Sequence, residues 1–280
     1  MTATFGARLR AAMDTRGPLC VGIDPHSALL TGWGLGDDVA GLERFAGTVV
    51  EALADRVAVF KPQSAFFERF GSRGIAVLER TIADARSAGA LVLLDAKRGD
   101  IGSTVEAYAQ AYLDASSPLF ADALTASPFL GYDSLEPLYA TAEKNGAGVF
   151  VLAFTSNPEG GEVQRALTPG GQTVGAAILA SAARRNAGAE PLGPIGAVIG
   201  ATVPDVPFDL AALNGPILAP GYGAQGGTPQ GLRALFGGAL RNVLPSTSRE
   251  LLRHGPDAAG LREAAKRSIG ECRAALDYLD

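Results

Sequence analysis

The sequence contains few residues that could form disulfides or bind transition metals. Its 280 residues include only two cysteines, Cys20 and Cys272, and two histidines, His26 and His254. Two distant cysteines give no disulfide framework, and no cysteine or histidine pair has the spacing of a zinc site. We therefore expect no metal centre, and no cofactor-binding motif is present. His26 could line a site, although a surface loop is the favoured position for it.

The chain also lacks the features of membrane, secreted and nucleic-acid-binding proteins. No apolar run approaches the roughly 18 residues of a membrane span. The first 17 residues have the pattern of an amphipathic helix, without the apolar centre of a signal peptide. A net charge of -5 argues against a broad basic face for nucleic acid. We predict a cytoplasmic protein with no membrane or nucleic-acid partner, in which a local pocket could still hold a small anion.

What the chain does have is a series of eight short apolar runs, each ended by polar, Gly or Pro residues. Their hydrophobicity is continuous rather than alternating, which is typical of parallel strands covered on both faces. Stretches with helical spacing lie between them, for example 41–56 and 74–89. The eight runs are 19–25, 57–63, 91–97, 123–128, 148–156, 195–202, 216–221 and 242–249.

Eight strands alternating with helices predict an α/β protein, a single (β/α)8 TIM barrel formed by residues 1–280. An open, doubly wound sheet is the alternative, but eight repeats at this length favour closure. The 36 glycines and 17 prolines occur without a repeat and indicate many loops. The longest irregular stretch, 156–175, predicts an excursion after the fifth strand. Its role could be that of a lid, an interface or a surface loop.

The most distinctive segment is LLDAKRGDIGST, residues 93–104. Asp95 and Lys97 are two residues apart, so on a strand they point to the same side. In a barrel they would reach the carboxyl-end mouth, where active sites lie. Charges in an apolar mouth are costly unless they are paired. With Lys61 and Asp100 they could form an alternating chain of unusual proton affinities, although a simple ion pair at a strand end is the alternative.

A glycine-rich loop at 219–231, APGYGAQGGTPQG, follows the seventh apolar run. Glycines let backbone N–H groups approach an anion closely. Barrels of this type frequently bind phosphate after strands seven and eight. Arg249, at the end of the eighth run, could add a charge-assisted contact. The barrel context therefore favours a phosphate site over an ordinary flexible loop.

Together these motifs resemble the orotidine 5′-monophosphate decarboxylase family, in its longer (type 2) subfamily, over nearly the whole chain. The most specific element is the D-x-K-x-x-D pattern of DAKRGD. It is supported by FKPQSAFFE around Lys61, TASPFLGYD around Ser127 and PGYGAQGG around Gln225. The resemblance implies a lyase that converts orotidine 5′-monophosphate to uridine 5′-monophosphate and CO2 in de novo pyrimidine biosynthesis, without a cofactor.

The same resemblance implies roles for the charged residues. Asp24 binds the ribose hydroxyls, and Lys61 binds the ribose and holds the charge chain. Asp95 lies against the substrate carboxylate. Lys97 donates the proton to C6 after CO2 leaves. Such a reaction forms a carbanion with no good delocalisation, so a nearby ammonium group suits it.

Further residues are implied to hold the base and to complete a dimer. Ser127 hydrogen-bonds the pyrimidine, and Gln225 bridges the pyrimidine and the phosphate. From the partner of a homodimer, three residues reach into each site: Asp100, Ile101 and Thr104.

The phosphate-binding residues implied by the resemblance are Gly223, with its neighbouring loop glycines, and Arg249. In shorter family members the phosphate-binding arginine usually follows a glycine, whereas Arg249 follows Ser248. Arg241 is therefore a competing candidate.

Two other functions stay open. Sugar-phosphate β-keto acid decarboxylases share the D-x-K-x-x-D pattern but use magnesium, and the TASPF and PGYGAQGG segments favour the pyrimidine nucleotide instead. A catalytically silent nucleotide-binding barrel is the second possibility, although every expected polar position is occupied. A Schiff-base aldolase is disfavoured, because the carboxylates beside Lys97 favour its ammonium form.

Overall fold

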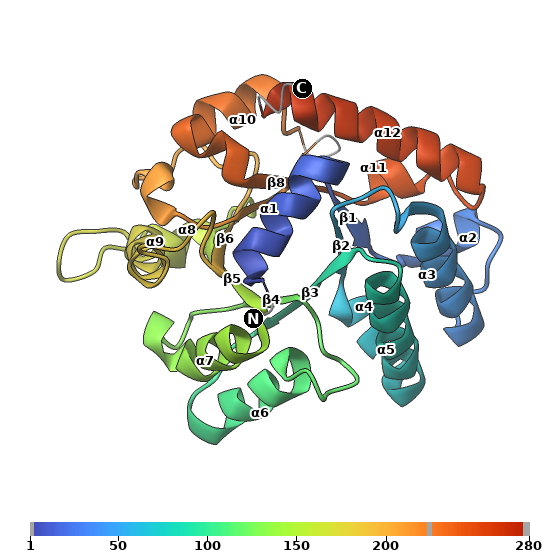
Figure 1. Ribbon diagram of the computed structural model, residues 1–280, viewed down its shortest axis with the longest axis horizontal. Coiled ribbons are helices and arrows are strands. Elements are labelled where there is room, and N and C mark those ends of the chain that lie inside the picture. The colour runs from blue at the N-terminus through green and yellow to red at the C-terminus, as the bar shows by residue number, and fades with distance from the viewer. Residues whose placement is uncertain (1–2, 223–225, 277–280) are drawn as a thin grey trace.

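The computed structural model describes residues 3–222 and 226–276 and contains a closed barrel of eight parallel strands (Figure 1). The ring closes where the first strand pairs with the eighth, Cys20 opposite Ser246. The predicted TIM barrel is confirmed, and the open sheet is excluded. The strands are β1 Cys20–Ile23, β2 Val59–Pro62, β3 Leu91–Arg98, β4 Ala123–Ala126, β5 Gly148–Phe154, β6 Ile195–Ile199, β7 Ile217–Pro220 and β8 Val243–Thr247.

Each strand lies inside the apolar run that predicted it, except that β3 continues one residue further, to Arg98. Helices cover the outside of the ring (Figure 1). They are α2 Ser27–Gly32, α3 Val39–Leu53, α4 Ser64–Glu68, α5 Gly71–Ser87, α6 Gly102–Leu113, α7 Glu136–Asn145, α8 Gly160–Gln164, α9 Val174–Arg185, α10 Pro229–Phe236, α11 Arg249–Leu252 and α12 Ala258–Ala275.

The alternation of strands and α-helices is incomplete, because β6 and β7 are joined by a 3₁₀ helix alone, η2 Leu210–Leu213. Two other 3₁₀ helices, η1 Tyr132–Leu135 and η3 Gly237–Asn242, lie before α7 and β8. No helix among the described residues is long and apolar enough to cross a membrane.

The amphipathic N-terminal segment forms α1, Phe5–Arg16, which lies across one end of the barrel (Figure 1). Phe5, Leu9 and Met13, spaced four residues apart, are buried together with side chains of the barrel interior. Arg8 donates a hydrogen bond of 2.7 Å to Asp122, the residue before β4. The contacts are made with the amino ends of the strands, so α1 covers the end opposite the carboxyl-end mouth.

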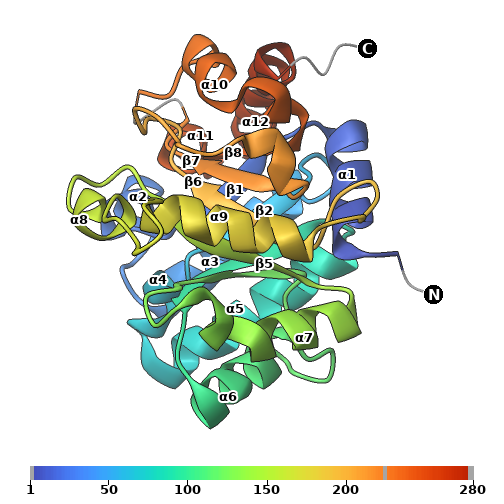
Figure 2. The ribbon, with the colours of Figure 1, turned by 90° about the vertical axis from the view of Figure 1, so that its left-hand side faces the viewer.

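The excursion predicted after the fifth strand is present between β5 and α9. It contains the short helix α8 and a bridge between Leu167 and Thr173, and it projects from the edge of the barrel (Figure 2). Gln164, at the end of α8, folds back onto the end of β5. Its Oε1 accepts a hydrogen bond from Thr155 N, and its Nε2 donates one to Thr155 Oγ1, both at 2.8 Å. The excursion is therefore attached to the mouth.

Candidate active site

Two adjoining cavities open at the carboxyl ends of the strands. The first, of about 400 Å³, lies over β1, β2, β7 and β8, and its lining includes Asp24, His26, Lys61, Phe66, Tyr222, Ser246, Thr247, Ser248 and Arg249. The second, of about 510 Å³, has an apolar wall of Leu152, Val198 and Leu218 together with Lys97, Thr125, Thr155, Ser156, Asn157 and Gln164. Asp95 and Pro220 line both cavities, so the two form one elongated site.

Asp95 lies between two lysines at the centre of this site. Its Oδ2 is 3.1 Å from Lys61 Nζ and its Oδ1 is 2.6 Å from Lys97 Nζ. The side chains of Lys61 and Asp95 are 8% and 10% exposed, whereas that of Lys97 is 46% exposed. The buried pair thus presents a more accessible ammonium group to the second cavity.

The predicted chain of alternating charges is only partly formed within one protomer. Lys61, Asp95 and Lys97 are joined, but Asp100 makes no ion pair with Lys97 in the part of the chain that the structure describes. Asp100 Oδ1 instead accepts a hydrogen bond from Ile101 N at 2.8 Å. Neither these two residues nor Thr104 lines either cavity.

The environment keeps the buried pair charged at neutral pH. Burial alone would raise the pKa of Asp95, but Lys61 and Lys97 outweigh it and hold this pKa below the ordinary value of 3.8. Burial would likewise lower the pKa of Lys61, but Asp24 and Asp95 outweigh it and raise this pKa above its ordinary 10.5. Each charge therefore stabilises the other.

An irregularity in β3 brings Asp95 and Lys97 to the mouth. Leu94 pairs with Leu124 and Arg98 with Ala126, so the three residues 95–97 lie opposite Thr125 alone. Such a bulge bends a strand and redirects its side chains. Lys97 there has a φ of +49°, which is uncommon for a lysine.

The first cavity contains buried polar atoms that have no hydrogen-bond partner within the described residues. They are Asp24 Oδ1 and Ser248 Oγ. Unpaired buried polar groups cost free energy, so they mark positions where a ligand hydroxyl or anion would be bound. His26 also lines this cavity, and its ring centroid is 4.2 Å from that of Phe66. The preference for a surface loop position at His26 is therefore corrected.

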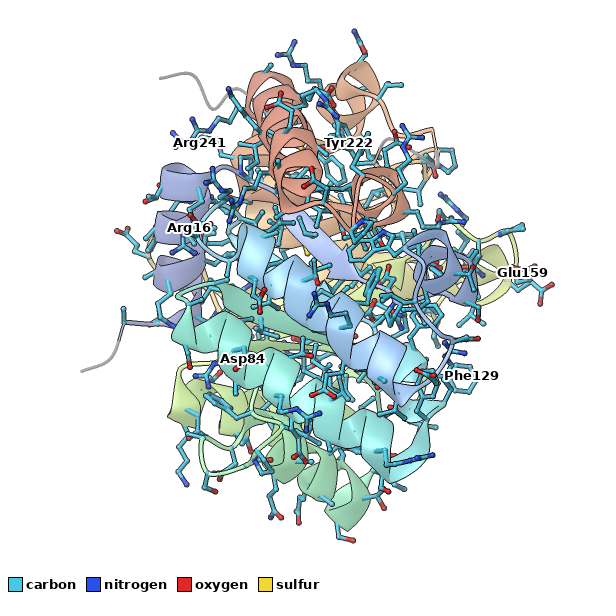
Figure 3. The ribbon with its side chains drawn as sticks, turned by 90° about the vertical axis from the view of Figure 1, so that its right-hand side faces the viewer. Arg16, Asp84, Phe129, Glu159, Tyr222 and Arg241 are labelled. Atoms are coloured by element: carbon cyan, nitrogen blue, oxygen red, sulfur yellow. The ribbon has the colours of Figure 1, made fainter. Side chains whose placement is uncertain are left out.

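The two candidate phosphate arginines lie at opposite ends of the barrel. Arg249 follows β8 and lines the first cavity with Tyr222. Arg241 precedes β8, 3.4 Å from Asp14 of α1, and Figure 3 shows it on the side away from Phe129 and Glu159. Arg241 therefore lies near the amino end of the barrel and lines neither cavity. Gly223 and Gln225 lie outside the described residues.

Ser127 does not line either cavity, in contrast to the position expected of a pyrimidine ligand. Its N–H donates to Arg98 O at 2.8 Å, which directs this segment along the end of β3. Ser156, just after β5, lines the second cavity with Lys97 instead. Thr125 and Gln164 also line this cavity, and neither they nor Ser156 were predicted from the sequence. Ser156 ends a predicted strand, the same signal that identified Ser127, so it could have been included.

Comparisons with known proteins show the family of the chain. A model of the orotidine 5′-phosphate decarboxylase / HUMPS family matches residues 17–264. The orotidine 5′-phosphate decarboxylase of Streptomyces coelicolor is 65% identical over 272 residues, which cover 97% of this chain and 98% of that protein. The relative from Corynebacterium efficiens with the same name is 51% identical over 274 residues, covering 97% of this chain and 98% of that protein.

Solved structures give the same result. A crystal structure described as orotidine 5′-phosphate decarboxylase from Streptomyces avermitilis matches with a TM-score of 0.94 and 64% identity, covering 99% of this chain and 97% of that one. The OMP decarboxylase of Leishmania donovani matches with a TM-score of 0.75 and 32% identity, covering 98% of this chain and all (100%) of that one. Since the family model and these relatives extend over nearly all of its length, the chain belongs to the orotidine 5′-phosphate decarboxylase / HUMPS family.

Proposed function

We propose that this protein is a lyase that decarboxylates orotidine 5′-monophosphate to uridine 5′-monophosphate and CO2, a step of pyrimidine biosynthesis. The observation that carries the proposal is the carboxylate of Asp95 held between Lys61 and Lys97 at the junction of the two cavities. Membership of the family supports the same reaction. The proposed mechanism uses the protein's own charges and assigns no step to a metal or an organic cofactor. A cytoplasmic location stays a prediction.

Lys97 is the proposed proton donor. Loss of CO2 leaves a carbanion at C6 of the pyrimidine, and an ammonium group beside it both stabilises the charge and supplies the proton. Asp95 keeps this ammonium in place through the contact of 2.6 Å and lies where the substrate carboxylate would be released. Unit charges 4 Å apart interact by about 4 kcal/mol at an effective dielectric of 20. That is well short of the largest enzymatic barrier reductions, roughly 23 kcal/mol, so other interactions must contribute.

The phosphate of the substrate is the proposed source of much of the remainder. Binding energy from a non-reacting group can hold a closed, dry site and offset the cost of placing a substrate carboxylate near Asp95. Arg249 would hold the phosphate in the first cavity. The family resemblance assigns Gly223 and Gln225 to the same phosphate, and both lie outside the described residues. Asp24 and Lys61 would bind the ribose between the phosphate and the reacting base.

The pyrimidine ring would occupy the second cavity, where Lys97 is. Of the two serine candidates, Ser156 lines this cavity and Ser127 does not, so we assign the base contact to Ser156. The wall of Leu152, Val198 and Leu218 is apolar, which suits an uncharged ring and the departing CO2.

A homodimer is the proposed assembly, with Asp100, Ile101 and Thr104 reaching into the partner's site. None of these residues lines a cavity of its own protomer. Ile101 is 61% exposed, and the adjacent loop after β4 exposes Phe129 and Leu130 by 75% and 54%. Large exposed apolar side chains near one another are typical of protein interfaces.

The proposed function is tested by following the ultraviolet absorbance of orotidine 5′-monophosphate with a chelator present. We expect turnover by the wild type, and a loss of at least about 10³-fold in kcat for Lys97→Ala, because one group supplies both acid catalysis and charge stabilisation. Lys266→Ala, at an exposed position of α12, is the matched control and should keep full activity. Near-normal turnover by Lys97→Ala would remove Lys97 as the acid.

Other outcomes identify the alternatives. Activity that disappears with chelator and no response to orotidine 5′-monophosphate would indicate a magnesium-dependent sugar-phosphate decarboxylase. Binding of uridine 5′-monophosphate without turnover would indicate a silent barrel. The role of the phosphate is tested with orotidine, which should react with a far lower kcat than the nucleotide at saturation.

A further inference from the structure

We propose that Thr125 is a positioning residue for Lys97, and that its hydroxyl couples the backbone of the proton donor to the carboxylate of Asp95. This inference rests on the proposed function, in which Lys97 protonates the substrate. Thr125 lies at the centre of β4 and is 1% exposed, so its hydroxyl has few partners other than those that β3 offers.

The irregular backbone of β3 leaves Lys97 N in need of a hydrogen-bond acceptor, which Thr125 provides. Where residues 95–97 lie opposite Thr125 alone, the regular ladder of backbone hydrogen bonds is interrupted. Lys97 N donates to Thr125 Oγ1 at 3.0 Å, so a side chain replaces the missing backbone acceptor. Lys97 and Asn214 are the only residues other than glycine with positive φ in the described ranges 3–222 and 226–276. A lysine in this conformation is strained and persists only where its surroundings hold it.

The same hydroxyl also determines the orientation of Asp95. A threonine hydroxyl has one proton, and because its oxygen accepts from Lys97 N, that proton is free to be donated to Asp95 Oδ1 at 2.9 Å. Asp95 Oδ1 also accepts a hydrogen bond from Lys97 Nζ, while Asp95 Oδ2 accepts one from Lys61 Nζ. Thr125 thus fixes which carboxylate oxygen faces which lysine.

The side chain of Lys97 depends on this arrangement because little else holds it. It is 46% exposed, and its ammonium group is restrained by Asp95 Oδ1 alone among the described residues. Thr125 acts on both ends of this residue, on the backbone directly and on the ammonium through Asp95. Loss of the hydroxyl would leave Lys97 N unpaired and Asp95 free to rotate, with Lys97 displaced from C6.

The test compares Thr125→Val, which keeps the shape and removes the hydroxyl, with Thr125→Ser, which keeps the hydroxyl. We expect kcat of Thr125→Val to fall by about 10- to 100-fold, since small misplacements of a catalytic group have effects of this size. KM should change by less than about threefold, because Thr125 is 1% exposed and its hydroxyl is already bonded to Lys97 N and Asp95 Oδ1. Thr125→Ser should recover most of the rate.

Thr81→Val is the matched control. Thr81 is also buried, and its hydroxyl donates only to Val77 O of its own helix, at 2.8 Å. Its loss should leave kcat unchanged. The inference is overturned if Thr125→Val keeps the wild-type kcat, or if Thr125→Ser loses as much as Thr125→Val. Should Thr125→Val not fold, the smaller Thr125→Ala, compared with Thr125→Ser, gives the same decision.

A second readout separates this inference from the proposed function. The backbone amide of Lys97 can be followed by hydrogen exchange without substrate in the wild type and both variants. We expect it to exchange faster in Thr125→Val, which removes the acceptor of this N–H, and at the wild-type rate in Thr125→Ser. Unchanged exchange in both variants overturns the inference even if the wild type is an active decarboxylase. A wild type that does not consume orotidine 5′-monophosphate overturns the proposed function, and the exchange rates still decide whether Thr125 holds the backbone of Lys97.

Discussion

At the scale of single residues, the site depends on a carboxylate that is buried and nevertheless charged. Asp95 is 10% exposed and would be costly to ionise alone, but two ammonium groups contact its two oxygens. In the proposed mechanism, this arrangement places negative charge where a substrate carboxylate is to be expelled and positive charge where a carbanion is to form. Removing one partner should therefore affect stability as well as activity.

Lys61→Met tests this charge pairing through the pH dependence of stability. In the wild type the pKa of Asp95 is below 3.8, so its contribution is present above that pH and is lost as the pH falls through the lower folded value. In the variant, burial is the largest influence on Asp95 and should raise its pKa, so the folded state becomes less favourable as the pH rises. We expect the variant to lose about 3 kcal/mol at pH 7 and less at about pH 4.5.

The measurement is urea unfolding of both proteins at the two pH values, with Lys266→Met in α12 as the exposed-lysine control. An equal loss at both pH values, or a greater loss in acid, would contradict the assigned role of Lys61.

At the scale of elements, the excursion between β5 and α9 forms part of the wall of the second cavity. Thr155, Ser156 and Gln164 all line it, and Gln164 makes two hydrogen bonds to Thr155. The short helix α8 is thereby held at the mouth. Of the three roles that the sequence left open, this position favours that of a lid over that of an idle surface loop.

Gln164→Leu should weaken substrate binding more than it slows the chemical step. The substitution removes both hydrogen bonds to Thr155, each contributing about 1 kcal/mol, and frees the segment that carries Ser156. We expect KM for orotidine 5′-monophosphate to rise by about three- to tenfold, with kcat changing less. Gln172→Leu is the control, because Gln172 lies in the same excursion and is exposed. Steady-state kinetics that show equal KM values for the two variants would rule out this contribution of the excursion.

At the scale of the whole molecule, the two ends of the barrel are used differently. The helix α1 covers the amino end, with Phe5, Leu9 and Met13 in the interior, and leaves the carboxyl end for the site (Figure 1). Next to that end, the loops after β3 and β4 expose Ile101, Phe129 and Leu130. A second copy of the chain docked on these loops would bring Asp100 near a neighbouring site.

Mixing two inactive variants tests the shared site. A heterodimer of Lys97→Ala and Asp100→Asn protomers contains one site with both native residues, if Asp100 acts across the interface. Random exchange at equal amounts should restore about a quarter of the wild-type activity, because half the dimers are mixed and each has one intact site. A mixture of Lys97→Ala with the double variant should restore none. Absence of recovery at every ratio, with subunit exchange confirmed by mass spectrometry, would count against shared sites.

The amino-acid sequence by itself determined the barrel and the charged groups at its mouth. Buried parallel strands need continuous apolar runs, and those runs contain all eight strands apart from Arg98, the last residue of β3. The pairing of Asp95 with Lys61 and Lys97 also follows from local pattern, because charges that end neighbouring buried strands must compensate one another.

Only the tertiary structure decided which other residues join these charges. The irregular pairing of β3 with β4 places Thr125 opposite residues 95–97. No local pattern in either segment encodes this register between the two strands. The proposed choices of Arg249 over Arg241 and of Ser156 over Ser127 likewise rest on which residues line the two cavities. These positions result from contacts between segments far apart in the chain, whereas sequence periodicity reports only on neighbours within one segment.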